Sequence, residues 1–155
     1  MDAATDTSDV IIAVDGNRYA LPLVRVSRVV RAVEVTPVPT APSVFLGVID
    51  VGGDVIPVVD LRTRLHLARR PIELEDCMAV VRAPVAMLVL PVDEVLGIAI
   101  DLEVPVDAQS APVHADCIDR VLCDADGLVL GLDLGCVVTD DECTALGIAA
   151  KDDPT

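Results

Sequence analysis

The sequence predicts an all-β protein, built as a barrel or a sandwich. Short valine-rich runs recur along the 155 residues, and Gly, Asp or Pro separates them, as expected for strands and turns. Apolar residues make up 53% of the chain and aromatic residues only 1%, so Val, Leu, Ile and Ala fill the core, and β-branched side chains favour strands. No helical pattern of ten or more residues separates the runs, which excludes an α/β layout. The length suits one domain, or two small barrels that share a core.

The clearest local element is a β-hairpin within residues 47–62. Two Val/Ile runs flank Gly52-Gly53-Asp54, and glycine tolerates the positive φ that a tight turn requires. The second run ends in Asp60-Leu61-Arg62. The other strands that we expect are residues 10–14, 19–23, 77–81, 86–90, 95–100, 118–122 and 128–132.

Several segments between the strands are less regular. Residues 24–35 alternate valine with arginine, and the alternation slips at Val29-Val30, which predicts a bulge or a short bend. Residues 36–42 contain three prolines, which lack the N–H of a paired strand, so this segment is a predicted loop. Residues 43–46 are a candidate for one helical turn, and residues 63–70 form a basic connector.

The two ends of the chain differ in character. Residues 1–8 are small and polar, and we expect them to be disordered. Residues 101–117 are a predicted long loop. Thr139 and Glu142 match a capping box, which predicts a short C-terminal helix over about 140–150. The expected organisation is therefore a disordered start at 1–8, one domain at 9–138, and a helix and tail at 139–155.

The net charge of −15 is unevenly distributed along the chain. Residues 1–70 carry 8 basic and 8 acidic side chains, whereas residues 71–155 carry 3 and 18. This acidity argues against nucleic-acid and anionic-lipid binding, because phosphate contacts require Lys and Arg. The first residues lack the features of a signal peptide, and the longest uncharged run, 35–49, is too short to span a bilayer. We therefore expect a cytoplasmic protein without direct membrane insertion.

No residue pattern points to catalysis, a metal or a cofactor. His114 and Cys117 form one weak metal-binding pair, whereas structural zinc sites show two such pairs. The carboxylates are not paired with a nucleophile or a histidine base, and no Gly-Lys-Ser/Thr follows the glycines of a phosphate loop. Five cysteines without a Cys-x-x-Cys pair are interpreted as reduced, mostly buried thiols.

Arginines gather in the otherwise acidic chain, and they leave two interpretations open. They can be solvated or paired within the molecule, or they can dock an acidic protein partner. The stripe consists of Arg25, Arg28, Arg31, Arg62, Arg64, Arg69 and Arg70.

Four segments, in the right order, resemble the CheW family, the adaptor proteins of bacterial chemosensory arrays. The strongest match is the hairpin at residues 47–62. The others are Tyr19-Ala20-Leu21-Pro22-Leu23 with Val26, Val92-Asp93-Glu94-Val95, and residues 127–138 with Leu132-Asp133. The resemblance implies two intertwined SH3-like five-stranded β-barrels with a groove between them and a short C-terminal helix. The boundary between the barrels is expected near 65–75, with the chain returning to the first barrel near its C-terminus.

The resemblance also implies a function without catalysis. Family members bind the regulatory domain of a CheA-type histidine kinase and the cytoplasmic tip of chemoreceptors, and so associate with membrane-bound arrays through their partners. By this resemblance, Asp60, Arg62 and Asp93 are structural residues that form charge-assisted hydrogen bonds. The residues implied in partner binding or its backbone support are Val26, Arg28, Gly47, Ile49, Val51, Gly52 and Gly53.

Three positions depart from the family pattern. Gly52 stands where an arginine is usual, Arg28 where an acidic residue is frequent, and Asp119 where a glycine is common. These exchanges alter electrostatic complementarity, so the alternative is a divergent paralogue or a regulatory barrel that binds another protein or a small ligand. Exchange of Gly47 for Asp is expected to abolish partner binding and to leave folding largely intact.

Overall fold

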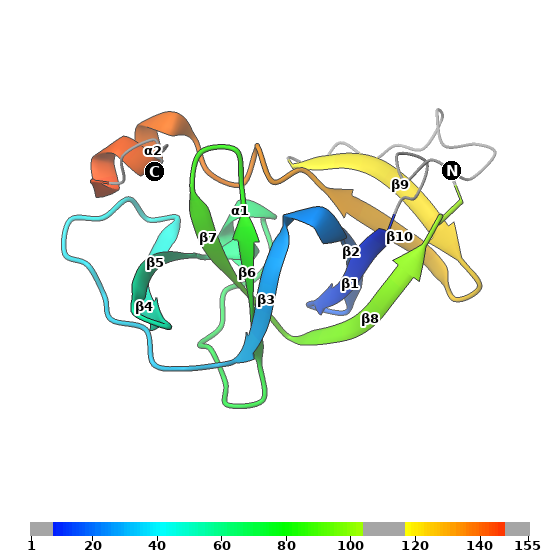
Figure 1. The fold of residues 1–155 in the computed structure, drawn as a ribbon, viewed down its shortest axis with the longest axis horizontal. Coiled ribbons are helices and arrows are strands. Elements are labelled where there is room, and N and C mark those ends of the chain that lie inside the picture. Colours follow the sequence, from blue (N-terminus) through cyan, green and yellow to red (C-terminus); the bar gives the residue numbers. More distant parts are fainter. Residues whose placement is uncertain (1–7, 104–116, 148–155) are drawn as a thin grey trace.

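The computed structural model describes residues 8–103 and 117–147, which form two five-stranded sheets, each curled into a barrel (Figure 1). The first sheet has the order β8-β1-β2-β10-β9 and the second the order β3-β6-β7-β5-β4. The strands of the first sheet are β1 Ser8–Val14, β2 Asn17–Pro22, β8 Glu94–Ile100, β9 Ile118–Asp124 and β10 Gly127–Leu132. The strands of the second are β3 Val26–Arg31, β4 Phe45–Val51, β5 Asp54–Val59, β6 Cys77–Arg82 and β7 Met87–Val92.

The chain passes from the first barrel to the second and back, so the barrels are intertwined. It leaves the first sheet through a 3₁₀ turn at Leu23–Arg25 and returns at Asp93, between β7 and β8. Residues 65–75, where the boundary was expected, connect two strands of the second sheet instead. Each sheet contains one parallel pair, β2 with β10 and β5 with β7. These parallel pairs join strands that are distant in the sequence, and no local sequence pattern marks the crossover.

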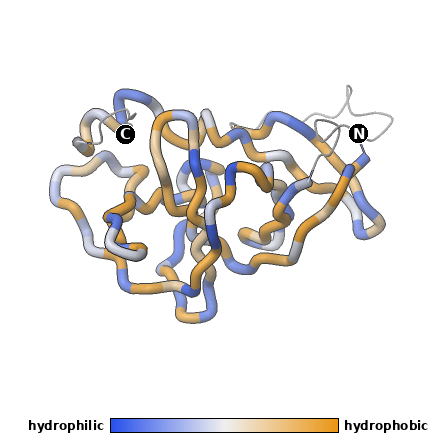
Figure 2. Tube along the Cα trace, viewed as in Figure 1, coloured by the Kyte–Doolittle hydropathy of each residue, from blue (hydrophilic) through white to orange (hydrophobic). Residues whose placement is uncertain are grey.

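Both barrels contribute to one hydrophobic core. The largest buried cluster includes Val10 and Leu21 from the first sheet and Val81 and Leu88 from the second. Each barrel also has a smaller cluster of its own, and strands that face a core on both sides carry continuous apolar runs. Figure 2 shows apolar residues predominating along the strands of both sheets. The predicted valine-rich core is therefore the part that holds the barrels together.

Local irregularities differ in detail from the sequence predictions. The strand at 24–35 is interrupted between Val26 and Arg28, two residues before the predicted slip, and β3 ends at Arg31. Residues 43–46 do not form the predicted helical turn. The structure has only one hydrogen-bonded turn there, in which the Phe45 N–H donates to the Pro42 carbonyl at 3.0 Å. The strand β4 begins at Phe45, since Val44 and Phe45 are drawn into the core.

Two short helices flank the second barrel. The helix α1, Leu61–Arg64, follows β5 directly, and its last two residues belong to the expected basic connector of residues 63–70. The helix α2, Asp140–Leu146, has the predicted capping box, in which Thr139 and Glu142 each accept the other's backbone N–H. It ends at Gly147, whose φ of +91° is the left-handed conformation of a helix C-terminus. None of the described helices is long and apolar enough to cross a membrane.

A disulfide joins Cys117 to Cys136, which corrects the expectation that all five cysteines are reduced. Cys117 directly precedes β9 and Cys136 follows β10, so the β9–β10 hairpin brings their Cα atoms to 5.0 Å. Cys77, Cys123 and Cys143 are free thiols. Burial raises the pKa of the Cys143 thiol, which lowers its reactivity.

Candidate functional site

The predicted hairpin is present as β4 and β5, joined by Gly52 and Gly53 at φ values of +60° and +95°. Positive φ at both central residues is the requirement of a type I′ turn. The Asp50 Oδ1 atom accepts the Gly53 N–H at 2.8 Å and fixes the turn. The two turn glycines are exposed, as is Val55 beside them, whose surface is 68% accessible. The tip of the hairpin is therefore open to a partner.

Two other candidate residues of the hairpin are interior. Ile49 is buried in the cluster that fills the second barrel, together with Ile56 and Val58. Gly47 is buried at a φ of +148°, and a Cβ there would collide with the carbonyl oxygen of Thr36 and lie 2.8 Å from its carbonyl carbon. Thr36 approaches this closely because it exchanges two backbone hydrogen bonds of 2.9 Å with Val48. Exchange of Gly47 for Asp thus perturbs the fold, contrary to expectation.

Of the remaining three candidates, Val51 is half-buried at the end of β4, and the other two are on β3, at one edge of the second sheet. Val26 is half-buried against the shared core, and Arg28 is exposed. The Arg28 Nη1 atom lies 3.9 Å from the position that a Cβ on Gly52 would occupy. Two of the departures from the family pattern are therefore spatial neighbours, although 24 positions separate them in the sequence.

A network of charges joins the two barrels where the chain crosses between them; we call it the junction. Asp93 accepts both Nη2 contacts of Arg62, at 2.9 and 3.0 Å, and one from Arg70 at 2.6 Å. Asp93 also accepts the backbone N–H of Asp15, in the β1–β2 turn, at 2.8 Å. Arg70 binds Asp76 through two further contacts of 2.9 Å. The second barrel is thus tied to a turn of the first by charge-assisted hydrogen bonds.

The junction shifts the titration of its members. Partial burial of Asp93 acts to raise its pKa, but the hydrogen bonds from the Asp15 N–H and from Arg62 outweigh it, so the pKa is lowered overall. The hydrogen bond to Asp76 raises the pKa of Arg70. Both groups therefore remain charged at neutral pH, and the network remains intact.

Asp60 and Arg64 fix the helices beside the junction. Asp60 caps α1 by accepting the Thr63 N–H at 3.3 Å and the Thr63 hydroxyl at 2.7 Å, and its carboxylate also contacts Arg69 at 3.1 Å. Arg64 donates to the Val137 carbonyl at 2.8 Å and to both carboxylate oxygens of Glu142 at 2.7 Å. These contacts hold α2 against α1.

The sequence interpretation missed an apolar row on β8, an edge strand of the first sheet. Leu96, Ile98 and Ile100 stay 46%, 61% and 66% exposed, and the β8–β1 register shifts by one residue at Leu96. We call these three residues the β8 row. Val95 packs on the shared core and Ala99 on the first barrel's own cluster, so residues 95–100 form an almost continuous apolar run, and this run was the available signal.

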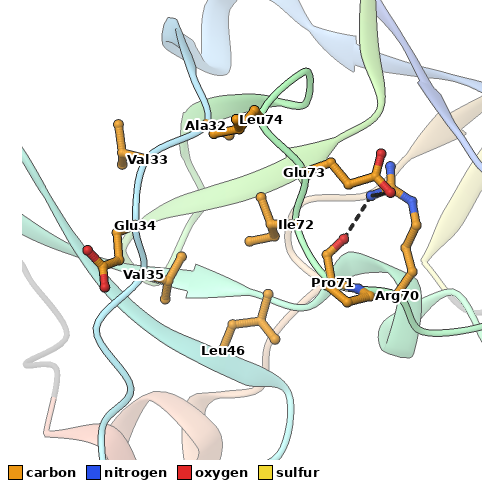
Figure 3. Close-up of a pocket in the computed structure, with 10 residues that line it drawn as sticks. All are labelled: Ala32, Val33, Glu34, Val35, Leu46, Arg70, Pro71, Ile72, Glu73 and Leu74. Atoms are coloured by element: carbon orange, nitrogen blue, oxygen red, sulfur yellow. Dashed lines mark hydrogen bonds and ion pairs between the residues drawn. The ribbon is translucent and has the colours of Figure 1, made fainter.

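A second surface feature is an open apolar groove of about 450 Å³ between the segments that follow β3 and α1 (Figure 3). The side chains of Val35, Leu46 and Ile72 point toward one another inside it, and Glu34 and Glu73 lie at its margin. The described residues contain no group of three or more His, Cys, Asp or Glu side chains placed to hold a metal ion. His114 lies outside the described residues, and Cys117 is in the disulfide.

Comparisons with known proteins agree with this geometry. The model of the CheW-like domain family matches residues 10–142, well over half of the chain. Among solved structures, the chain is similar to the crystal structure of scaffolding protein TtCheW from Thermoanaerobacter tengcongensis, with a TM-score of 0.70 and 22% identity. That match covers 83% of this chain and 89% of the other, and it confirms the predicted fold of two SH3-like barrels. No curated protein sequence matches. The chain belongs to the CheW-like domain family.

Proposed function

We propose that this protein is a non-catalytic adaptor that couples the cytoplasmic tips of chemoreceptors to a CheA-type histidine kinase in a bacterial chemosensory array. Membership of the CheW-like domain family supports the proposal. The observation that carries it is the β8 row, because three large apolar side chains of one edge strand stay exposed to water. Exposed contiguous apolar surface of this kind marks an interaction site.

The dimensions of the β8 row suit a helical partner. Ile98 and Ile100 pair regularly with Val10 and Ser8, so they share one face and are about 6.6 Å apart. An α-helix rises about 5.4 Å per turn, so these two side chains span about one turn of a helix laid along them. We assign this row to an apolar face of the receptor's helical tip, in a helix-in-groove mode.

The hairpin tip and β3 provide a second surface, which we assign to the kinase regulatory domain. Gly52, Gly53 and Arg28 are exposed there and are suited to direct contact. The half-buried Val26 and Val51 border the surface, while the buried Gly47 and Ile49 keep the hairpin in shape. An adaptor with two separate surfaces can hold both partners at once.

The test uses three exchanges of an exposed apolar residue for glutamate. Ile98→Glu lies in the β8 row, Val55→Glu lies beside the hairpin turn, and Leu128→Glu is the matched control on β10, where the side chain is 59% exposed. The receptor tip and the kinase regulatory domain encoded in the same genome are titrated into each protein by calorimetry. Ile98→Glu is expected to weaken receptor binding at least tenfold. Val55→Glu is expected to weaken kinase binding at least tenfold.

Leu128→Glu is expected to bind both partners as the unchanged protein does. Circular dichroism checks that each variant is folded. Failure of the unchanged protein to bind either partner would overturn the proposal, and so would an equal loss in Leu128→Glu.

A second candidate function rests on the groove in Figure 3. Its volume and its largely apolar lining are within the range of small-molecule sites, which favours a regulatory barrel that binds a ligand. A thermal-shift screen of metabolites tests it. A reproducible rise in melting temperature with one compound, together with no binding to either protein partner, would favour this function over the adaptor.

A further inference from the structure

The arginines of the described chain divide into two groups. Six have a carboxylate oxygen within 4 Å, namely Arg18, Arg62, Arg64, Arg69, Arg70 and Arg120. Four have no carboxylate partner among the described residues, namely Arg25, Arg28, Arg31 and Arg82, and Arg82 donates instead to the Val24 carbonyl at 2.7 Å. All four lie at one edge of the second barrel, on the 3₁₀ turn, on β3, and on β6, which pairs with β3.

This distribution is unexpected in a chain of net charge −15 with 26 acidic residues. Neighbouring like charges repel, so an unneutralised arginine cluster is unfavourable by itself, and this protein has an excess of carboxylates that neutralise arginines elsewhere. Arg28 lies beside the glycine turn, where Asp50 is already engaged by the Gly53 N–H. The cluster is therefore a basic surface left available in an acidic protein.

Exposed valines lie among these arginines. Val24 is 75% exposed and Val29 is 41% exposed, next to Arg25 and Arg28. We call the four arginines and these two valines the β3 edge. Arginine and apolar side chains together are typical of protein interfaces, where a guanidinium forms bidentate bonds to carboxylates.

We propose that the β3 edge binds an acidic helical segment of a partner protein. The proposal rests on the adaptor function and specifies the chemistry of one of its partners. Arg28 and Arg31 are three residues apart on a strand, or about 10 Å, and they pair regularly with Val80 and Cys77 of β6, so their side chains project from opposite faces of the edge strand. Val29 shares the face of Arg31. The partner helix thus has acidic residues on both sides of an apolar stripe, and the stripe packs on Val29.

Nucleic acid is a poorer occupant of this surface. The two aromatic residues of the chain, Tyr19 and Phe45, are both buried, so the surface has no ring on which a base stacks. The overall negative charge also repels a polyanion over long distances. Phosphate-backbone binding needs a larger positive field than this surface of four arginines supplies.

A second explanation is protection of an edge strand. Charged side chains on an edge prevent it from pairing with the edge of another molecule. In that case, removing the charge produces self-association and has no effect on binding of an acidic helix. The two explanations therefore predict different measurements.

The test uses two labelled helical peptides of about 25 residues. They share one sequence with an apolar stripe, and the positions on both sides of the stripe are Glu in one peptide and Lys in the other. Fluorescence anisotropy is expected to show binding of the Glu peptide and not of the Lys peptide, with affinity falling as salt is added. Arg31→Gln is expected to weaken Glu-peptide binding three- to tenfold.

The matched control is Ala125→Asp, which makes the same change in net charge in the exposed β9–β10 turn of the first barrel. It should leave peptide binding unchanged, since it alters only the long-range field. Equal binding of both peptides, or an equal loss in Ala125→Asp, would overturn the proposal. Self-association of Arg31→Gln in sedimentation, with peptide binding unchanged, would assign the arginines to edge protection. Stronger binding of a single-stranded oligonucleotide than of the Glu peptide would also overturn it.

Ile98→Glu separates this proposal from the adaptor function. If Glu-peptide binding persists in Ile98→Glu while neither chemosensory partner binds the unchanged protein, the adaptor function fails and the acidic-helix surface stands. If both partners bind but the Glu peptide does not, the adaptor function stands and the β3 edge proposal fails.

Discussion

The junction and the β3 edge are both rich in arginine, but the arginines of the junction are paired with carboxylates of the described chain and those of the β3 edge are not. At the junction, Arg62 and Arg70 converge on Asp93, which also caps the β1–β2 turn through the Asp15 N–H. Along the β3 edge, Arg28 and Arg31 meet no carboxylate of the described chain. The difference lies in topology, because the junction gathers connectors from both barrels, whereas an edge strand has neighbours on one side only. Arg62 and Arg70 are structural because several elements converge on them, whereas Arg28 and Arg31 are the arginines that we propose for a partner.

This division of the arginines was not accessible from the sequence. Arg62 and Asp93 are 31 positions apart, and Arg62 and Asp15 are 47 apart, so no local pattern links them. The sequence interpretation placed Arg25 and Arg28 in one basic stripe with Arg62 and Arg70. Pairing within the molecule accounts for Arg62, Arg64, Arg69 and Arg70, whereas docking of an acidic partner stays a proposal for the rest of the stripe.

Features that depend on nearby residues were predicted well. The hairpin turn at Gly52-Gly53 and the capping box at Thr139 each need only a few neighbours. The sheet crossovers, by contrast, depend on packing between distant strands. The disulfide lies between these two kinds of feature. Cys117 precedes and Cys136 follows the predicted hairpin of β9 and β10, so the sequence already indicated that the two cysteines could meet.

The largest effect is expected at Gly47, on the other edge strand of the second sheet. This edge differs from the β3 edge because the Thr36 backbone already closes over it. Gly47→Ala forces a Cβ against the Thr36 carbonyl, and we expect the free energy of unfolding to fall by about 3 kcal/mol, from strain and overpacking. Urea denaturation measures it.

Gly97→Ala is the matched control for this collision. Gly97 has a similar φ of +138°, but nothing lies within 4 Å of a Cβ there. We expect a loss of about 1 kcal/mol from backbone strain alone. Equal losses of unfolding free energy in the two variants would show that the collision with the Thr36 carbonyl adds nothing to the cost of a side chain at residue 47.

The next largest effect is expected at the centre of the junction. Asp93→Ala leaves Arg62 and Arg70 without this acceptor, and we expect the free energy of unfolding to fall by about 2 kcal/mol, as for lost hydrogen bonds to a charged group. Asp54→Ala, an exposed acidic residue of the hairpin, is the control and should change stability by less than about 0.5 kcal/mol. A junction that tolerates Asp93→Ala as well as it tolerates the control would not hold the barrels together.

Acid is expected to break the ion pairs of the paired arginines, because it protonates their carboxylate partners. The arginines of the β3 edge have no such pairs to lose within the described chain. The hydrogen bond from Arg18 lowers the pKa of Asp124 to about 2. A carboxylate whose pKa is lower in the folded chain stabilises it above the unfolded value of about 4, and this contribution is lost as the pH falls toward 2. Stability should therefore fall between pH 4 and pH 2, and less steeply in Asp124→Asn. Urea midpoints across this range measure the slope, and an unchanged slope in Asp124→Asn would contradict the assignment.

The smallest effect is expected on the β3 edge itself. Arg28→Gln and Arg31→Gln remove no ion pair of the described chain, so each should change the free energy of unfolding by less than about 0.5 kcal/mol. Arg70→Gln, with the same change in charge, should lose about 2 kcal/mol, because Asp76 is 6% exposed and loses its partner. If Arg31→Gln were as destabilising as Arg70→Gln, the β3 arginines would be part of the scaffold. A small effect on stability, combined with a large effect on acidic-helix binding, would instead assign them to a partner, since residues that hold a fold and residues that face a partner respond differently to the same exchange.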